Sequence, residues 1–105
     1  MSIKDIKITR LKQISLSGGN VLHALKKTDK DFIGFGEAYF SWIAPDFVKG
    51  WKKHLKMTSN FVVPVGEVTF IFYDQINNIM HKEVIGVENY CRIKVPPNIW
   101  YGFKV

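Results

Sequence analysis

The sequence predicts an all-β protein with a single domain, and three observations support this prediction. Its 105 residues are the length of one domain, and its 47% hydrophobic content is enough for a buried core. Eight Phe, four Tyr and three Trp residues favour a sheet, in which aromatic side chains pack well. Short apolar runs are separated by isolated glycines and prolines, which are typical of turns. We therefore expect a sandwich, a jelly roll or a small barrel, with residues 1–105 forming one domain.

The N-terminal part is expected to contain two strands. The run IKITRLKQI alternates apolar and polar residues from Ile6, which is typical of a strand, and SGGN after it predicts a turn. VLHALKK is too short to assign. FIGFGEAYFSWI, residues 32–43, is rich in aromatics and predicts a long strand, in which Gly34 and Gly36 mark a bulge or a close backbone contact.

Residues 45–55 fit two structures. Pro45 followed by Phe47, Val48, Trp51 and Leu55 has the spacing of a short amphipathic helix, and the pattern by itself favours that helix.

The second half of the chain has the clearest strand patterns. FVV and VTFIFY predict two strands joined by a tight turn at PVGE, and DQINN predicts the next turn. IMHKEVIGV, YCRIKV and IWYGFKV predict three more strands, with PPN as a rigid corner before the last.

Charge and cysteine content narrow the range of partners. The formal net charge of +6 predicts attraction to an anion, such as nucleic acid, a nucleotide, a phosphosugar or an acidic lipid. Cys91 is the single cysteine, so an internal disulfide is excluded. The N-terminus MSIKDIKITRLKQ is charged throughout, and no apolar run has the length of a membrane span. We therefore expect no signal peptide, no membrane partner and a cytoplasmic location.

Three segments, FGEAYFSWI, VKGW..H.KMT.NFVV..G.V.F..YD and VPPNIWYGF, follow one another along the chain. Together they resemble the cupin family that contains dTDP-4-dehydrorhamnose 3,5-epimerase, above all its shorter epimerase-like relatives encoded with surface-polysaccharide genes. The resemblance spans about Val21 to Phe103. It implies a double-stranded β-helix (jelly roll), a homodimer and a nucleotide-sugar ligand. It also makes residues 48–52 a strand at the barrel mouth instead of part of a helix.

The resemblance implies chemistry at the same segment. The epimerases remove a proton next to a ketone, with a histidine base in the pattern Arg-Gly-apolar-His and a tyrosine acid after a later block. Lys49 takes the place of that arginine, and Lys52 takes the place of the base. His54 matches the second histidine of the His-x-His pair in the shorter relatives and in the sugar 3,4-ketoisomerases. The sequence ends at Val105, so the tyrosine acid has no counterpart in it.

A metal is not expected. Metal-binding cupins use His-x-His, a glutamate and a later histidine, which suit a divalent transition metal. In this sequence the first histidine position holds Lys52, the glutamate position falls near Ser59 and Asn60, and the later histidine position holds Tyr101. His54 is therefore the single ligand of that set that is present.

The candidate site therefore combines one possible base with several binding residues. His54 is the candidate catalytic residue, and its alternative role is a histidine hydrogen-bonded at the barrel mouth. The candidate substrate-binding residues are Lys49, Lys52, Asn60, Tyr101 and Glu37. If residues 48–52 form a strand, Lys49 and Lys52 are expected to point to opposite faces.

Three functions are consistent with these residues. The first is an epimerase or isomerase of a dTDP-4-keto-6-deoxy sugar in polysaccharide biosynthesis, with no cofactor and with lysine in the usual base position. The second is a cupin without activity that binds a nucleotide sugar or a partner subunit. The third, a basic barrel that binds single-stranded nucleic acid, explains the charge but not the three ordered segments, and we expect no nucleic-acid partner.

Overall fold

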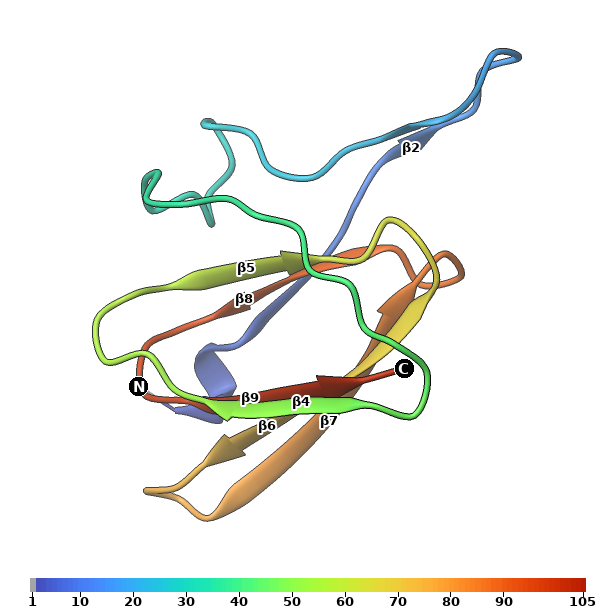
Figure 1. Ribbon diagram of the computed structural model, residues 1–105. Helices are drawn as coiled ribbons and strands as arrows, with labels where there is room; N and C mark the ends of the chain where they lie inside the picture. Colours follow the sequence, from blue (N-terminus) through green and yellow to red (C-terminus); the bar gives the residue numbers. More distant parts are fainter. Residues whose placement is uncertain (1) are drawn as a thin grey trace.

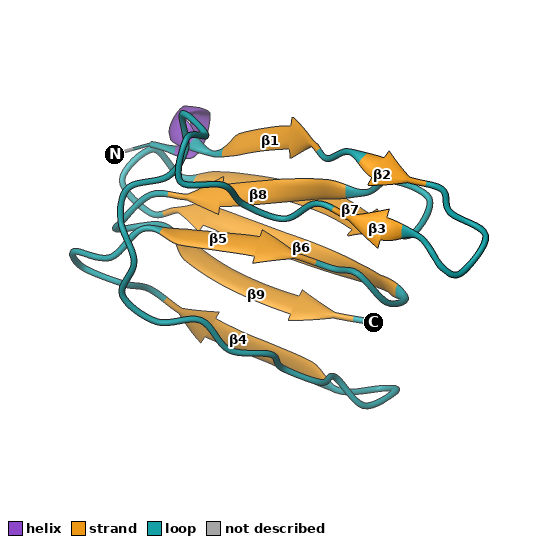
Figure 2. Ribbon diagram, turned by 90° about the horizontal axis from the view of Figure 1, so that it is seen from above, coloured by secondary structure: helices purple, strands orange, loops and turns teal. Residues whose placement is uncertain are grey.

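The computed structural model describes residues 2–105, which form two facing antiparallel sheets and a projecting hairpin (Figures 1 and 2). The order of the first sheet is β1-β8-β5, that of the second is β4-β9-β6-β7, and β2 pairs with β3 in the hairpin. The elements are η1 (Ile3–Asp5), β1 (Lys7–Arg10), β2 (Gln13–Ile14), β3 (Val21–Leu22), β4 (Val48–Lys52), β5 (Ser59–Val62), β6 (Glu67–Asp74), β7 (Ile79–Gly86), β8 (Cys91–Val95) and β9 (Trp100–Lys104). This is the jelly-roll type of all-β fold that the sequence predicts.

Alternation along the central strands builds the core between the sheets. In β6, every second residue from Val68 to Asp74 is buried, as expected for a strand with one face on the core. Ile93 of β8 faces this strand from the other sheet and is fully buried. The main core cluster is Val63, Val68, Phe70, Phe72, Ile85, Cys91, Ile93, Val95, Ile99 and Tyr101.

Asp74 at the end of β6 ties the N-terminus to the core. Its carboxylate accepts hydrogen bonds from the backbone N–H of Ile3, at 3.0 Å, and from the backbone and side chain of Asn77. The Asn77 side-chain hydrogen bond lowers the pKa of Asp74, and the backbone donors add to this against the effect of burial. The buried charge therefore has the partners it requires.

Two predictions about local structure are wrong. Residues 48–52 form the edge strand β4 and not a helix, as the resemblance required, because they pair with β9. Residues 32–43 form no strand within the described chain, although their aromatic content predicted one. This segment crosses the open side between β5 and β4 in an extended path (Figure 1). No helix in the described residues is long and apolar enough to span a membrane.

Candidate functional site

His54 and Tyr101 form a hydrogen-bonded pair. The Nε2 of His54 lies 3.0 Å from the Oη of Tyr101, and the two rings are tilted with their centroids 5.8 Å apart. His54 follows β4, and its carbonyl accepts a 2.8 Å hydrogen bond from the backbone N–H of Asn98 in the proline corner. Because Tyr101 is the second residue of β9, the strand that follows this corner, the corner holds both members of the pair in place.

Aromatic side chains surround the phenol of Tyr101. Phe61 of β5 contacts it edge-on with ring centroids 5.1 Å apart, and Phe103 stacks at 6.4 Å. Burial raises the pKa of Tyr101, and proximity to Tyr39 raises it further. The phenol therefore keeps its proton throughout the neutral range and can donate a hydrogen bond.

The register of β4 brings two lysines to the face of Tyr101. Lys49 pairs with Phe103 and Lys52 pairs with Tyr101, so three residue steps on β4 match two on β9. This irregularity is a β-bulge, which changes the phase of the side chains along the strand. Paired residues of antiparallel strands point to the same side of the sheet. Lys49 and Lys52 therefore share a face, and the expectation that they point to opposite faces is wrong.

The two lysines have different surroundings. The Nζ of Lys49 donates to the hydroxyl of Ser41 at 3.1 Å and to the carbonyl of Trp42 at 2.8 Å. It thereby fastens the segment that crosses the open side of the fold. Lys52 is exposed, and no ion pair is formed with it in the described part of the chain. Its charge is available to an anion next to Tyr101.

Asn60 and Glu37, the other two candidate substrate-binding residues, do not lie beside the His54–Tyr101 pair. Asn60 pairs with Lys94, while its neighbour Phe61 pairs with Ile93 of the core. Alternation therefore places Asn60 on the outer face of the β1-β8-β5 sheet, where its side-chain Oδ1 is buried without a hydrogen-bond partner. Glu37 lies exposed in the segment that crosses the open side.

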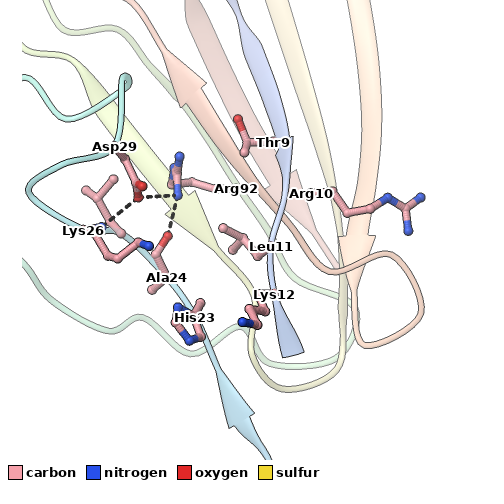
Figure 3. A pocket seen from close by; sticks show the side chains of 10 residues that line it. Thr9, Arg10, Leu11, Lys12, His23, Ala24, Lys26, Asp29 and Arg92 are labelled. Carbon is pink, nitrogen blue, oxygen red and sulfur yellow. Dashed lines mark hydrogen bonds and ion pairs between the residues drawn. The ribbon is translucent and has the colours of Figure 1, made fainter. Parts of the chain in front are cut away.

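Two cavities lie outside this pair. One, of about 170 Å³, lies beside β4 and β9 and is lined by residues that include Lys49, Trp51, Ile71 and Phe103. The other, of about 180 Å³, lies against β1 and β8, and its lining includes Lys12, His23, Lys26 and Arg92 (Figure 3).

Arg92 is a buried charge that the sequence did not predict. It is 3% exposed on the outer face of β8, where it donates to the carbonyl of Ala24 at 2.6 Å. It also pairs with Asp29 and Asp31, at 3.5 and 3.4 Å (Figure 3 shows the contacts to Ala24 and Asp29). A buried charge requires such partners. Arg92 therefore fastens residues 24–31 to the sheet, and the alternation of YCRIKV gave no sign of this role.

The donor groups do not form a metal centre. Among residues 2–105, no three His, Cys, Asp or Glu side chains gather closely enough to hold an ion. The arrangement instead combines a histidine, a protonated phenol and a cation at one end of β4 and β9.

Comparisons with known proteins find relatives among sugar-modifying enzymes. The chain is 37% identical to a dTDP sugar isomerase from Desulfovibrio desulfuricans G20, whose crystal structure superposes with a TM-score of 0.92 over 97% of this chain and 69% of that one. It is 27% identical over 110 residues to the Haloferax volcanii protein named "Probable low-salt glycan biosynthesis epimerase Agl13", covering 98% of this chain and 70% of the relative. No family model matches the sequence.

Proposed function

Because the chain belongs to the family of sugar isomerases and epimerases that includes this Desulfovibrio enzyme, we propose that it moves a proton on a dTDP-4-keto-6-deoxy sugar. The reaction takes place next to the ketone, as an epimerisation or as an isomerisation that shifts the carbonyl to the neighbouring carbon. The proposed product belongs to surface-polysaccharide biosynthesis, and the proposed location is the cytoplasm.

The pairing of His54 with Tyr101 is the observation that supports this proposal best. A histidine is a suitable general base near neutral pH. Tyr101 puts a phenol 3.0 Å from the imidazole. The pair therefore combines a proton acceptor with a proton donor at one point.

The chemistry follows from these groups. His54 takes the proton from a carbon next to the ketone, and the electron pair moves onto the ketone oxygen to give an enolate. In an epimerisation, a proton returns to the same carbon from the opposite face. In an isomerisation, the carbon that loses its proton bears a hydroxyl group. The proton of that hydroxyl moves to the enolate oxygen and a proton is delivered to the former ketone carbon, so that the hydroxyl becomes the new ketone and the former ketone becomes a hydroxyl. Tyr101 lies on the same side as His54, so the geometry offers it as the donor for the isomerisation, in which the proton can return on that side.

Lys52 supplies the positive charge for this reaction. It lies directly opposite Tyr101 in the strand register, on the same face of the sheet. An ammonium group there stabilises the negative charge that develops on the enolate oxygen or binds the diphosphate of the sugar carrier. In this proposal Lys52, which occupies the usual position of the base, stabilises negative charge, and His54 is the base.

Exchange of solvent deuterium tests the proposal. The protein is incubated with a dTDP-4-keto-6-deoxy sugar in deuterated water, and both conversion of the sugar and incorporation at carbons 3, 4 and 5 are followed by NMR. We expect incorporation with the wild type and a loss of about 100-fold or more with His54→Gln. A matched control is His81→Gln, because the exposed imidazole of His81 pairs with Glu83 on β7, two strands away from β9.

A second function is favoured by one observation. Lysine stands where the resemblance places the base, so the chain could bind a nucleotide sugar without converting it. Saturable binding of the dTDP sugar, without deuterium incorporation and without conversion of the sugar, would establish this second function and exclude the first. Absence of both binding and exchange would exclude both.

A further inference from the structure

The cavity of about 180 Å³ beside Arg92 lies on the outer face of the β1-β8-β5 sheet, and neither His54 nor Tyr101 lines it. One wall is formed by residues 9–12, which lead from β1 into β2, and the other by residues 23–26 and Asp29, which follow β3 (Figure 3). Sites for drug-sized molecules measure about 300–1,000 Å³. A guest of this cavity is therefore a small molecule or an ion.

Positive charge dominates the lining of this cavity. Its four basic residues are Arg10, Lys12, Lys26 and Arg92, and Asp29 is the one acidic residue among the described residues that line it. The carboxylate of Asp29 is already engaged, because its Oδ2 accepts from the backbone N–H of Lys26 at 2.8 Å and lies 3.5 Å from Nη1 of Arg92. Within residues 2–105, Lys12 and Lys26 form no ion pair. Two ammonium groups beside the cavity therefore lack a counter-ion.

Arg92 has a hydrogen-bond donor that is not used. Its Nη1 donates to the carbonyl of Ala24 and its Nη2 lies 3.4 Å from Asp31, but its Nε is buried without a hydrogen-bond partner. A buried donor without an acceptor carries the full cost of its lost hydration, and in native proteins such an atom often marks a bound water or ion. An acceptor seated in the cavity that Arg92 lines would satisfy it.

We propose that this cavity binds a small oxyanion of the phosphate class, either inorganic phosphate or the phosphate group of a monoester. One oxygen accepts from the Nε of Arg92, while Lys12 and Lys26, one from each wall, balance the charge. The imidazole of His23 carries an N–H in either neutral tautomer and is a further donor. Donors on two walls and at the base need several acceptor oxygens, which an oxyanion has and chloride lacks.

The proposed anion site goes beyond the proposed function and does not depend on it. None of its residues belongs to β4 or to the proline corner. Arg10 lines the cavity as well, but Figure 3 shows its side chain pointing away from the other lining residues, so we assign it no contact. A bound anion would join the base of the projecting β2–β3 hairpin to β8, because the two walls flank that hairpin in the sequence.

NMR of the arginine side chains tests the site in the wild-type protein. The sequence contains two arginines, Arg10 and Arg92, so the Nε–H spectrum has two signals, and Arg10→Lys identifies the signal of Arg92. Orthophosphate is titrated at constant ionic strength, with chloride as the control anion. We expect a saturable shift of the Arg92 signal with phosphate and none with chloride. Absence of a saturable shift with phosphate, or the same shift with chloride, would indicate a cavity that holds only water and would overturn the proposal.

Substitution of the two unpaired lysines supplies a second test. Lys12→Met and Lys26→Met should each raise the dissociation constant of orthophosphate about tenfold or more, the effect of losing one charge-assisted hydrogen bond. Lys27→Met is the matched control, because Lys27 is exposed next to Lys26 in the sequence but does not line the cavity. Isothermal titration measures all three. Equal weakening by the three substitutions would show a general attraction to the basic protein and would overturn the site.

Two further arms identify the source of the phosphate and separate this site from the proposed sugar site. Tighter binding of orthophosphate than of a sugar 1-phosphate assigns the site to the free ion, and the reverse order assigns it to a monoester; both outcomes support the site. Lys52→Met should leave the phosphate-dependent shift of Arg92 unchanged, because Lys52 lies on β4. Loss of that shift in Lys52→Met would place the phosphate at β4 and overturn the proposal.

Discussion

The imidazole Nε2 of His54 and the phenol Oη of Tyr101 meet at 3.0 Å, although 47 positions separate the two residues in the sequence. The contact arises because the proline corner hydrogen-bonds to the backbone of His54 and begins the strand that holds Tyr101. The raised pKa of Tyr101, caused by burial, keeps the phenol protonated at neutral pH. It can therefore donate its proton to the imidazole or to a substrate carbanion.

Tyr101→Phe should abolish proton transfer while leaving the protein folded. It removes one hydroxyl and keeps the ring that packs on Phe61 and Phe103. We expect deuterium incorporation into the dTDP-4-keto-6-deoxy sugar to fall by about 100-fold to 10,000-fold, the usual contribution of a general acid.

The matched control is Tyr90→Phe. Tyr90 is as buried as Tyr101, and its hydroxyl donates to the carbonyl of His23 at 2.8 Å, away from the pair. This variant should lose about 1 kcal/mol of stability with unchanged exchange. If both variants exchange deuterium at the wild-type rate, Tyr101 is not the acid.

Lys52→Met should weaken binding of the dTDP sugar. Lys52 faces the same side as Tyr101, and its removal takes one cation from the proposed anion site. We expect the dissociation constant to rise about tenfold, which corresponds to about 1.4 kcal/mol, with a smaller dependence on salt. Isothermal titration at two salt concentrations measures both effects.

Lys56→Met is the control for Lys52→Met. Lys56 is exposed in the loop after β4, and Lys56→Met lowers the net charge of the protein by the same amount as Lys52→Met. Equal weakening by both substitutions would indicate a general attraction to the basic protein and no specific contact with Lys52.

The sequence predicted the strands of the second half well, for a physical reason. In β6 the alternation of apolar and polar residues follows burial on one face, whereas β8 is buried on both faces, and turn residues lie between the strands. In and around β4 the apolar residues at 47, 48, 51 and 55 have helical spacing, because the bulge breaks the period of two. Local pattern could not reveal that irregularity, and so the shared face of Lys49 and Lys52 was missed.

Residues 33–43, the aromatic segment, show a second limit of structure prediction from the sequence. Residues 33–43 alternate like a strand, but a strand needs a neighbour, and the described chain supplies none. The pairing of His54 with Tyr101 was also not predictable, because sequence patterns do not give distances between strands that are far apart in the chain.

Gly50→Ala should destabilise the fold and disturb the site together. A Cβ at this position would lie 2.9 Å from the Cα of Gly102 across the β4–β9 pair, and backbone atoms cannot move aside cheaply. We expect a loss of about 1–3 kcal/mol in the free energy of unfolding, measured by urea denaturation. Because Gly50 lies inside the bulge, Lys52→Met and Gly50→Ala should weaken sugar binding in the same direction.

Gly18→Ala provides the comparison for Gly50→Ala. Gly18 lies in the turn between β2 and β3, with open space around the position of a Cβ. This substitution should change stability by less than about 0.5 kcal/mol. A similar loss in both variants would show that glycine entropy, and not the close approach of β4 to β9, determines the effect.

Asp74→Asn should lower stability at neutral pH and matter less in acid. The carboxylate of Asp74 accepts from Ile3 and Asn77, and the Asn77 hydrogen bond holds its pKa below the ordinary value of 3.8. A lowered pKa stabilises the folded protein above the unfolded value, and this stabilisation disappears as the pH falls through the folded value. The difference in Tm between wild type and Asp74→Asn should therefore be constant above about pH 5 and shrink toward about pH 3. Calorimetry across this range measures it, with the exposed Glu88→Gln as control. A difference in Tm that stays the same from neutral pH to acid would show that the charge of Asp74 does not anchor the N-terminus.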